Sequence, residues 1–332
     1  MSSNEVAKTE GSMNNLFDEY TNMMAEDRDI PIVDTPGTIE EAKETGEIFE
    51  ETTELVDDSK DSIYVPGGFG VSSESATEAD DGVVITDGTN EFVWIPVPDY
   101  TTMYEDTKGS VKLNGVTTTT NVYSKLRPRS GDSYTFVPPG NTNSVSVREP
   151  DVLSSYDTDK QYYSILGYSS TQEMAEGLVE EYIKTYNSIK KYKGFYIGRY
   201  ELTGTMASPT VQKRQTVLTG QNWYNLKKAC NNVVSTEYAQ SEMIYGNQWD
   251  EVISWLISTG KKTSEELNEN SSSWGNYSDS TGEAVTGSGT KRVSGYNEAW
   301  KANNIYDLSG NCREITQEAL STNYRISRGR WI

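Results

Sequence analysis

Residues 304–331 read NIYDLSGNCREITQEALSTNYRISRGRW, and this stretch decides the predicted fold. Its first part, YDLSGN, places apolar residues ahead of Ser-Gly-Asn, a pattern typical of a short strand that ends in a tight turn. Gly310 and Asn311 are the two residue types that adopt a positive φ most readily. We therefore expect a tight turn at these two residues.

The stretch resembles the C-terminal core of the formylglycine-generating-enzyme (sulfatase-modifying factor) family, a branch of the C-type-lectin-like fold. That family has N-x-[FY]-D-[LM]-[SA]-G-N-V-W-E-W-T followed, after a spacer, by R-V-x-R-G-G-S-W. Cys312-Arg313-Glu314-Ile315 replaces V-W-E-W, and Arg328-Gly329-Arg330 replaces R-G-G. The residues that form the turn match the family pattern, whereas the side chains between the matching positions differ. This is expected of a surface that displays variable side chains on a rigid backbone. The matching positions are Asn304, Tyr306, Asp307, Leu308, Ser309, Gly310, Asn311, Glu314, Thr316, Arg325, Arg328, Gly329 and Trp331.

Three other stretches extend the resemblance. Residues 194–203 match the family's G-F-x-I-x-x-[YF]-E-V-T, a central strand, and we expect Glu201 at its end to be structural. Residues 221–232 resemble the helix W-x-x-A-x-x-x-C-N, with Cys230 as a small buried residue. Residues 243–256 predict a loop that leads into a helix, with Trp249 and Trp255 packed inward. The resemblance implies an α+β fold of the C-type-lectin-like, formylglycine-generating-enzyme type, with short twisted strands, a few helices and much loop.

The chain divides by composition into an acidic segment and a domain. Residues 1–60 hold 17 acidic and 4 basic residues and few aromatic ones, which predicts a disordered or assembly tail with a short helix within 39–55. We expect residues 61–332 to form the lectin-like domain. Within it, residues 98–170 form a loop-rich insertion without helical period. Residues 171–190 show apolar spacing near 3.6 and predict an amphipathic helix whose aromatic stripe packs in the core.

Charge and composition exclude several classes of protein. The net charge of −21 disfavours nucleic acid and anionic membranes as partners, because both carry negative charge. The chain has no His, which removes the commonest general base and metal ligand. Its two cysteines give no disulfide framework or metal spacing, and no signal peptide or transmembrane run is present. We expect a soluble protein without cofactor or metal, in a phage particle or in the bacterial cytoplasm or surface.

The family resemblance raises an enzymatic alternative, the oxidation of a sulfatase cysteine to formylglycine. Family enzymes use a cysteine pair that follows R-G-G-S-W, whereas this sequence ends at Ile332, one residue after R-G-R-W. Cys312 and Cys230 lie at other positions of the family pattern. We therefore predict no catalytic residues. Because family members continue with a loop and a closing strand, we also expect a truncated chain with an open sheet edge.

The non-enzymatic branch of the family includes the variable proteins of diversity-generating retroelements, in which template adenines direct substitutions on a C-terminal display surface. Several residues of this chain depart from the family pattern, and their types are those that substitution at adenine-containing codons produces. They alternate with the fixed points, and in an extended segment this alternation turns one set outward. The predicted ligand-binding residues are Cys312, Arg313, Ile315, Leu320, Tyr324, Ile326, Ser327 and Arg330.

The sequence thus favours a ligand-binding display protein, such as a phage or bacterial receptor-binding protein. Its ligand would be a macromolecule, either protein or glycan. An undiversified lectin-like binder remains open, and so does a phage structural or decoration subunit, a homo-oligomer assembled through the acidic segment. No motif predicts calcium-dependent sugar binding.

Overall fold

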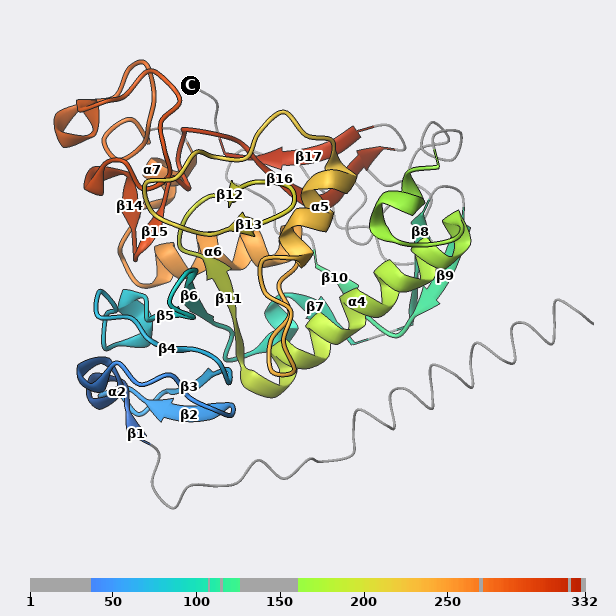
Figure 1. Ribbon diagram of the computed structural model, residues 1–332, viewed down its shortest axis with the longest axis horizontal. Coiled ribbons are helices and arrows are strands. Elements are labelled where there is room, and N and C mark those ends of the chain that lie inside the picture. The colour runs from blue at the N-terminus through green and yellow to red at the C-terminus, as the bar shows by residue number, and fades with distance from the viewer. Residues whose placement is uncertain are drawn as a thin grey trace, which may run out of the picture. The chain divides into compact units, whose positions relative to one another are not determined.

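The computed structural model describes residues 37–106, 108–113, 116–125, 161–268, 271–321 and 324–329 (Figure 1). They show a mixed α+β fold of several small sheets and few helices, as predicted at that level. The acidic residues 1–36, residues 126–160 of the predicted insertion, and Arg330 lie outside the described residues.

Residues 37–60, which composition assigned to the acidic segment, contain strands and a helix and belong to one compact unit with the residues that follow them. Strand β1 (Gly37–Thr38) runs parallel to β2 (Thr53–Val56), which pairs antiparallel with β3 (Ser62–Val65). Helix α2 (Ile39–Thr45) lies between β1 and β2 and starts with a capping box, in which Thr38 and Glu41 each bind the other's backbone N–H. Ile39, Ala42 and Leu55 are buried at 1%, 6% and 2% exposure. These few apolar anchors fold a segment whose net charge suggested disorder.

A four-stranded antiparallel sheet forms the centre of the fold, in the order β11-β6-β5-β4. Its strands are β4 (Gly70–Val71), β5 (Val84–Thr86), β6 (Glu91–Pro96) and β11 (Gly194–Gly198). The strand predicted to be central, β11, pairs only with β6 among the described strands and is an edge strand of this sheet. The position of a strand within a sheet depends on which distant segments pair with it, and the apolar content of the strand does not indicate those partners. The short helix η1 (Ala79–Asp81) precedes β5.

The two faces of this sheet bury different cores. Along β6, Val93 and Ile95 point into a core shared with helices α4 (Thr171–Tyr192) and α6 (Gly246–Ser258), whereas Trp94 points into the core beneath β2 and β3. The predicted helix at 171–190 is confirmed as α4, and its aromatic residues Tyr182 and Tyr186 lie in the core. Trp249 and Trp255 of α6 are buried, as predicted.

The described parts of the predicted insertion contain short elements. They are η2 (Tyr100–Thr102), β7 (Tyr104–Glu105), β8 (Gly109–Leu113), β9 (Val116–Thr120), β10 (Tyr123–Ser124) and η3 (Tyr162–Leu166). β8 and β9 form a hairpin, β7 pairs with β10, and the hairpin lies beside α4 (Figure 1). The insertion therefore extends the core around α4.

The C-terminal part consists of short elements and a terminal hairpin. Before the hairpin come β12 (Thr203–Gly204), β13 (Pro209–Thr210), α5 (Trp223–Asn231), α7 (Ser264–Asn268), η4 (Gly282–Val285), η5 (Glu298–Trp300), β14 (Lys301–Ala302) and β15 (Ile305–Tyr306). The hairpin itself pairs β16 (Glu314–Ser321) with β17 (Tyr324–Arg328). The predicted turn is confirmed, with φ values of 83° at Gly310 and 59° at Asn311.

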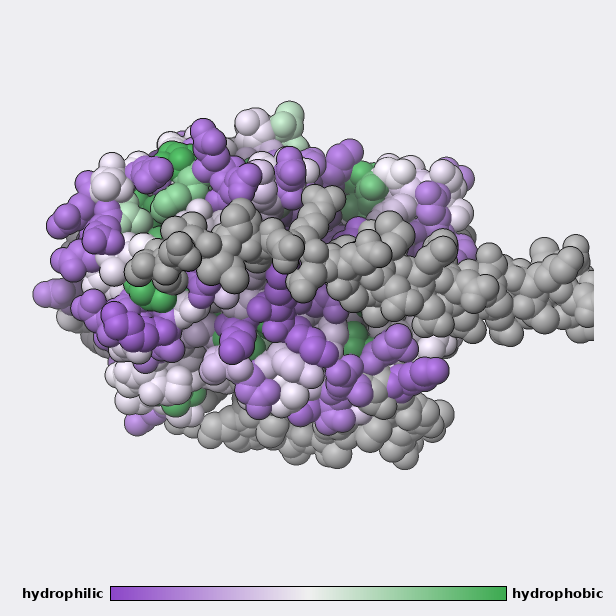
Figure 2. All heavy atoms as spheres, turned by 90° about the horizontal axis from the view of Figure 1, so that it is seen from below, coloured by the Kyte–Doolittle hydropathy of each residue, from purple (hydrophilic) through white to green (hydrophobic). Residues whose placement is uncertain are grey.

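The face of the molecule drawn in Figure 2 is largely hydrophilic over its described residues. Figure 2 shows polar side chains over most of the described atoms of one face, with hydrophobic residues in small separate groups. In the described ranges, no helix combines the length and apolar character that a membrane crossing needs.

Candidate functional site

The turn before the terminal hairpin is fixed by side chains from distant segments. Asn311 donates from Nδ2 to Glu201 at 2.6 Å, and its Oδ1 accepts from Asn276 Nδ2 at 3.0 Å and from the backbone N–H of Arg292 at 2.8 Å. The backbone N–H of Cys312 donates to the other oxygen of Glu201 at 3.0 Å. Glu201 therefore has the structural contacts expected of it.

Gly310 is required by the same arrangement. A Cβ at this position would lie 2.3 Å from the carbonyl oxygen of Asn276, and its φ of 83° is strained for any other residue. The Ser-Gly-Asn sequence therefore brings the chain close to residues 275–276 and sets the starting point of β16.

Buried carboxyl groups surround this turn. Burial and the nearby charge of Asp307 raise the pKa of Glu201 to about 8, although hydrogen bonds from Asn311 and Cys312 act in the opposite direction. Burial also raises the pKa of Asp307 to about 6. Burial, with the charge of Glu201, raises the pKa of Glu314 well above its usual range, and its Oε2 has no hydrogen-bond partner among the described residues. No group of three His, Cys, Asp or Glu residues in the described ranges is placed to hold a metal ion.

The base of the hairpin is anchored by a buried ion pair. Arg328 donates to Glu318 from Nε at 2.8 Å and from Nη2 at 2.5 Å, and its Nη1 lies 3.5 Å from Asp250 of α6. The backbone N–H of Gln317 donates to the carbonyl of Ile244 at 3.1 Å. Trp223 of α5 donates from its indole N–H to the carbonyl of Thr316 at 3.1 Å. Strand β16 is therefore held by two helices and by the segment before α6.

The predicted ligand-binding residues differ in exposure. Arg313 and Ser327 are exposed, whereas Cys312, Ile315 and Ile326 are half-buried. Ile315 and Ser327 are cross-strand partners, so the hairpin brings these two positions together. Leu320 lies in β16 and Tyr324 in β17, but their side chains, like Arg330, are outside the described residues. Among the predicted frame residues, Gly310, Asn311, Thr316 and Arg328 are buried.

A cavity of about 230 Å³ opens beside the turn. Cys312, Arg313 and Ile315 of the predicted set line it, together with Glu314. Its other lining residues were not predicted from the sequence, because they come from segments that are far apart in the chain and look like ordinary apolar positions. They include Leu202, Val217, Leu218, Leu226 and Met243.

Neither thiol at this cavity is in a reactive state. Burial raises the pKa of Cys230 to about 12. Burial and the charge of Glu201 do the same for Cys312. Because the thiolate is the reactive form, both residues are protonated and unreactive near neutral pH.

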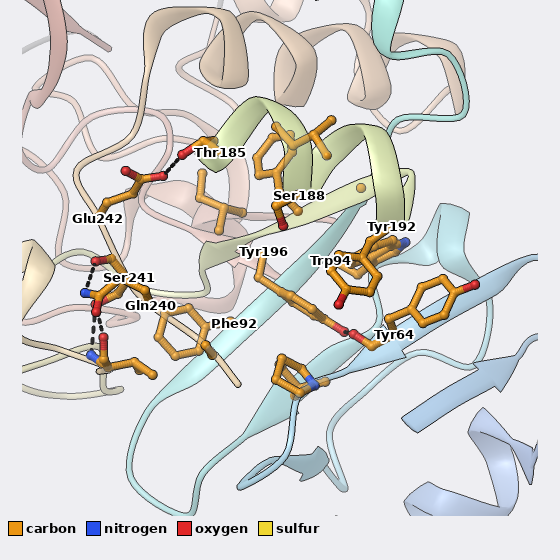
Figure 3. Close-up of a pocket in the computed structure, with 18 of the residues that line it drawn as sticks. Tyr64, Phe92, Trp94, Thr185, Ser188, Tyr192, Tyr196, Gln240, Ser241 and Glu242 are labelled. Atoms are coloured by element: carbon orange, nitrogen blue, oxygen red, sulfur yellow. Dashed lines mark hydrogen bonds between the residues drawn. The ribbon is translucent and has the colours of Figure 1, made fainter. Parts of the chain in front are cut away.

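A larger cavity of about 390 Å³ lies between α4, β11 and residues 238–244 (Figure 3). The rings of Trp94 and Tyr196 lie along it with centroids 5.0 Å apart, and those of Tyr64 and Tyr192 with centroids 5.1 Å apart. The Tyr196 hydroxyl donates to the carbonyl of Tyr64 at 3.1 Å, which fixes the Tyr196 ring. The sequence offered one signal for this cavity, the density of aromatic residues in 192–200, which is equally typical of a core.

A buried ionic cluster borders the same cavity. Lys227 of α5, whose side chain is 1% exposed, forms an ion pair with Glu181 of α4. Glu242 accepts hydrogen bonds from the hydroxyls of Thr185 and, at 3.4 Å, of Tyr245. Thr185 and Glu242 lie at one end of the cavity, and Tyr64 and Tyr192 lie at the other (Figure 3).

The two carboxyl groups of this cluster differ in protonation. Burial alone would raise the pKa of Glu181, but the Lys227 ammonium and hydrogen bonds hold it below its usual range. Burial, together with the charge of Glu181, raises the pKa of Glu242 well above its usual range. The opposite shifts favour a protonated Glu242 beside an ionised Glu181.

Comparison with models of known protein families, with curated proteins and with solved structures gave no significant match to this chain. The geometry of the turn, the terminal hairpin and the two cavities is therefore the basis on which a function is assigned.

Proposed function

We propose that this protein is a non-enzymatic ligand-binding protein that displays variable side chains on its C-terminal hairpin. We also propose that the α+β fold is of the C-type-lectin-like, formylglycine-generating-enzyme type, because the residues that fix the turn are those of the family pattern. The binding residues are Cys312, Arg313, Ile315, Leu320, Tyr324, Ile326, Ser327 and Arg330. A phage or bacterial receptor-binding protein is the corresponding biological class.

One observation carries this proposal. Cys312, Arg313 and Ile315, selected because they depart from the family pattern, line one cavity beside a turn that is fixed by Glu201 and Asn311. Side chains held at the rim of a cavity by a rigid backbone bind a ligand without the entropy cost of ordering a loop.

The state of the cysteines supports a binding role over oxidase chemistry. Formylglycine formation needs reactive thiols, whereas burial keeps both Cys230 and Cys312 protonated. Oxidation of a sulfatase-derived cysteine peptide by the copper-supplemented protein, measured by mass spectrometry, would overturn the non-enzymatic assignment.

Diversification can be tested on DNA without knowing the ligand. The 3′ end of the gene and its flanking sequence would be determined in several isolates. We expect substitutions at the eight binding positions and invariant codons for Gly310, Asn311, Glu314, Thr316 and Arg328. We also expect a near-copy of the segment, with adenines at the variable codons, beside a reverse transcriptase gene.

The opposite outcome is equally clear. Substitutions spread evenly over buried and exposed codons, with no near-copy, would reject diversification. The hairpin would then be a fixed binding surface, and exchange of Arg313 and Ile315 would still be expected to weaken binding of its partner.

A further inference from the structure

The ionic cluster at the larger cavity has one acid more than it has bases. Lys227 neutralises Glu181, and no second cation of the described residues forms an ion pair with Glu242. A second carboxylate beside Glu181 is costly, and desolvation together with the charge of Glu181 raises the pKa of Glu242, which favours its protonated form in the empty protein. A cation brought to Glu242 would take the place of that proton.

Glu242 is accessible to a ligand from the cavity. It is partly exposed, and it lines both the larger cavity and the smaller one beside the turn. The Thr185 hydroxyl, which donates to Glu242, and the exposed Ser188 also line the larger cavity from α4. This end of the cavity thus offers several oxygen atoms that can accept hydrogen bonds from an N–H donor.

The other end of the cavity suits an apolar group. Tyr196 lies between Phe92 and Trp94, and Tyr64 and Tyr192 follow beyond it (Figure 3). Aromatic faces carry negative partial charge and a large apolar area, so they attract the body of an organic cation and repel an anion. A cavity of about 390 Å³ is within the size range that holds small organic ligands.

We propose that the larger cavity binds a primary amine with an aromatic or apolar body. Its ammonium group lies at Glu242, and its body lies against Tyr196 and Trp94. The two cavities share Glu242, but none of the described binding residues proposed on the terminal hairpin lines the larger cavity, so the amine site does not depend on the function proposed there.

The charged and titratable groups around Glu242 determine which of them loses a proton when an ammonium ion binds. Glu181 of α4 and Lys227 of α5 remain paired. Tyr245, which directly precedes α6, is buried, and burial raises the pKa of its phenol and keeps it neutral. Lys184 of α4 lines the cavity but is exposed, so water and salt screen its charge. Binding of an ammonium ion therefore displaces the Glu242 proton.

The test compares a cation with a neutral molecule of the same shape. The full chain is titrated at neutral pH with 2-phenylethylammonium chloride and with 2-phenylethanol, by isothermal calorimetry in two buffers of different ionisation enthalpy. We expect the amine to bind at least about tenfold more tightly than the alcohol. The buffer dependence of the heat should show proton release on amine binding only.

Three variants test whether the amine binds in the larger cavity with its ammonium group at Glu242. Glu242→Gln keeps the shape of the side chain, and we expect it to remove both the preference for the amine and the proton release. Ser188→Trp fills the cavity from the exposed side of α4 and should abolish binding of both compounds. Glu44→Gln, at an exposed position of α2, is the matched control and should change nothing.

Each contrary result overturns the proposal. Equal binding of amine and alcohol would show that Glu242 does not select a cation. The absence of saturable amine binding below about 10 mM would show that the cavity is not an amine site. An amine preference that survives in Glu242→Gln, or binding that survives in Ser188→Trp, would place the amine elsewhere. If Glu242→Gln does not fold, the amine and alcohol comparison decides the question.

Discussion

Replacement of Asn311 by Ala tests how strongly the turn holds the terminal hairpin. The Asn311 side chain makes four hydrogen bonds, to Glu201, to Asn276, and to the backbone N–H and carbonyl of Arg292. A net contribution of about 1 kcal/mol for each of the shorter three gives about 3 kcal/mol. The φ of 59° adds about 1 kcal/mol of strain for Ala.

The expected loss in the free energy of unfolding for Asn311→Ala is thus about 4 kcal/mol, a large part of the roughly 5–15 kcal/mol that stabilises a typical domain. Asn311→Gly loses the same hydrogen bonds without the strain, so it should be about 1 kcal/mol more stable than the Ala variant. The assay is urea unfolding followed by tryptophan fluorescence and circular dichroism.

Asn232→Ala is the matched control, because Asn232 is exposed at the end of α5 and should cost less than about 0.5 kcal/mol. If Asn311→Ala unfolds within about 1 kcal/mol of the unmodified protein, the side-chain contacts do not hold the turn. The frame on which the display proposal depends would then be wrong.

Three further predictions concern the frame, the buried carboxyl groups and the ionic cluster. Arg328→Ala removes the guanidinium that pairs with the buried carboxyl of Glu318 and should cost about 3–5 kcal/mol. Arg313→Ala, at an exposed display position, should cost less than about 0.5 kcal/mol in the same unfolding assay. Because the raised pKa of Glu314 makes the folded state hold a proton that the unfolded state releases, stability falls as pH rises above the usual carboxyl range. Glu314→Gln should therefore gain stability relative to the unmodified protein between pH 5 and pH 8, by at most about 1.4 kcal/mol per pH unit, and a pH-independent difference would refute this. Lys227→Ala leaves Glu181 without its cation and should lower the free energy of unfolding by about 3–5 kcal/mol. Lys228→Ala, at the neighbouring exposed position, should leave the free energy of unfolding nearly unchanged. Thermal unfolding of the two variants measures this difference.

Much of the local structure follows from the sequence because its causes are local. Apolar spacing over residues 171–190 predicts a helix, and the Ser170 hydroxyl caps α4 by accepting from the backbone N–H of Glu173 at 3.1 Å. Gly310 and Asn311 mark the turn because they adopt positive φ at little cost. The inward positions of Trp249 and Trp255 follow the expectation that the family resemblance of residues 243–256 implies.

The tertiary structure decided what depends on contacts between distant segments. The edge position of β11 is set by its pairing with β6, about a hundred residues earlier, and the folding of residues 37–60 depends on the burial of Ile39 and Leu55. Glu181, Lys227 and Glu242 come from three segments, and no spacing in the chain indicates that they meet. Local conformational preferences act within a few residues, whereas cavities and buried charge clusters arise only when remote side chains exclude water together.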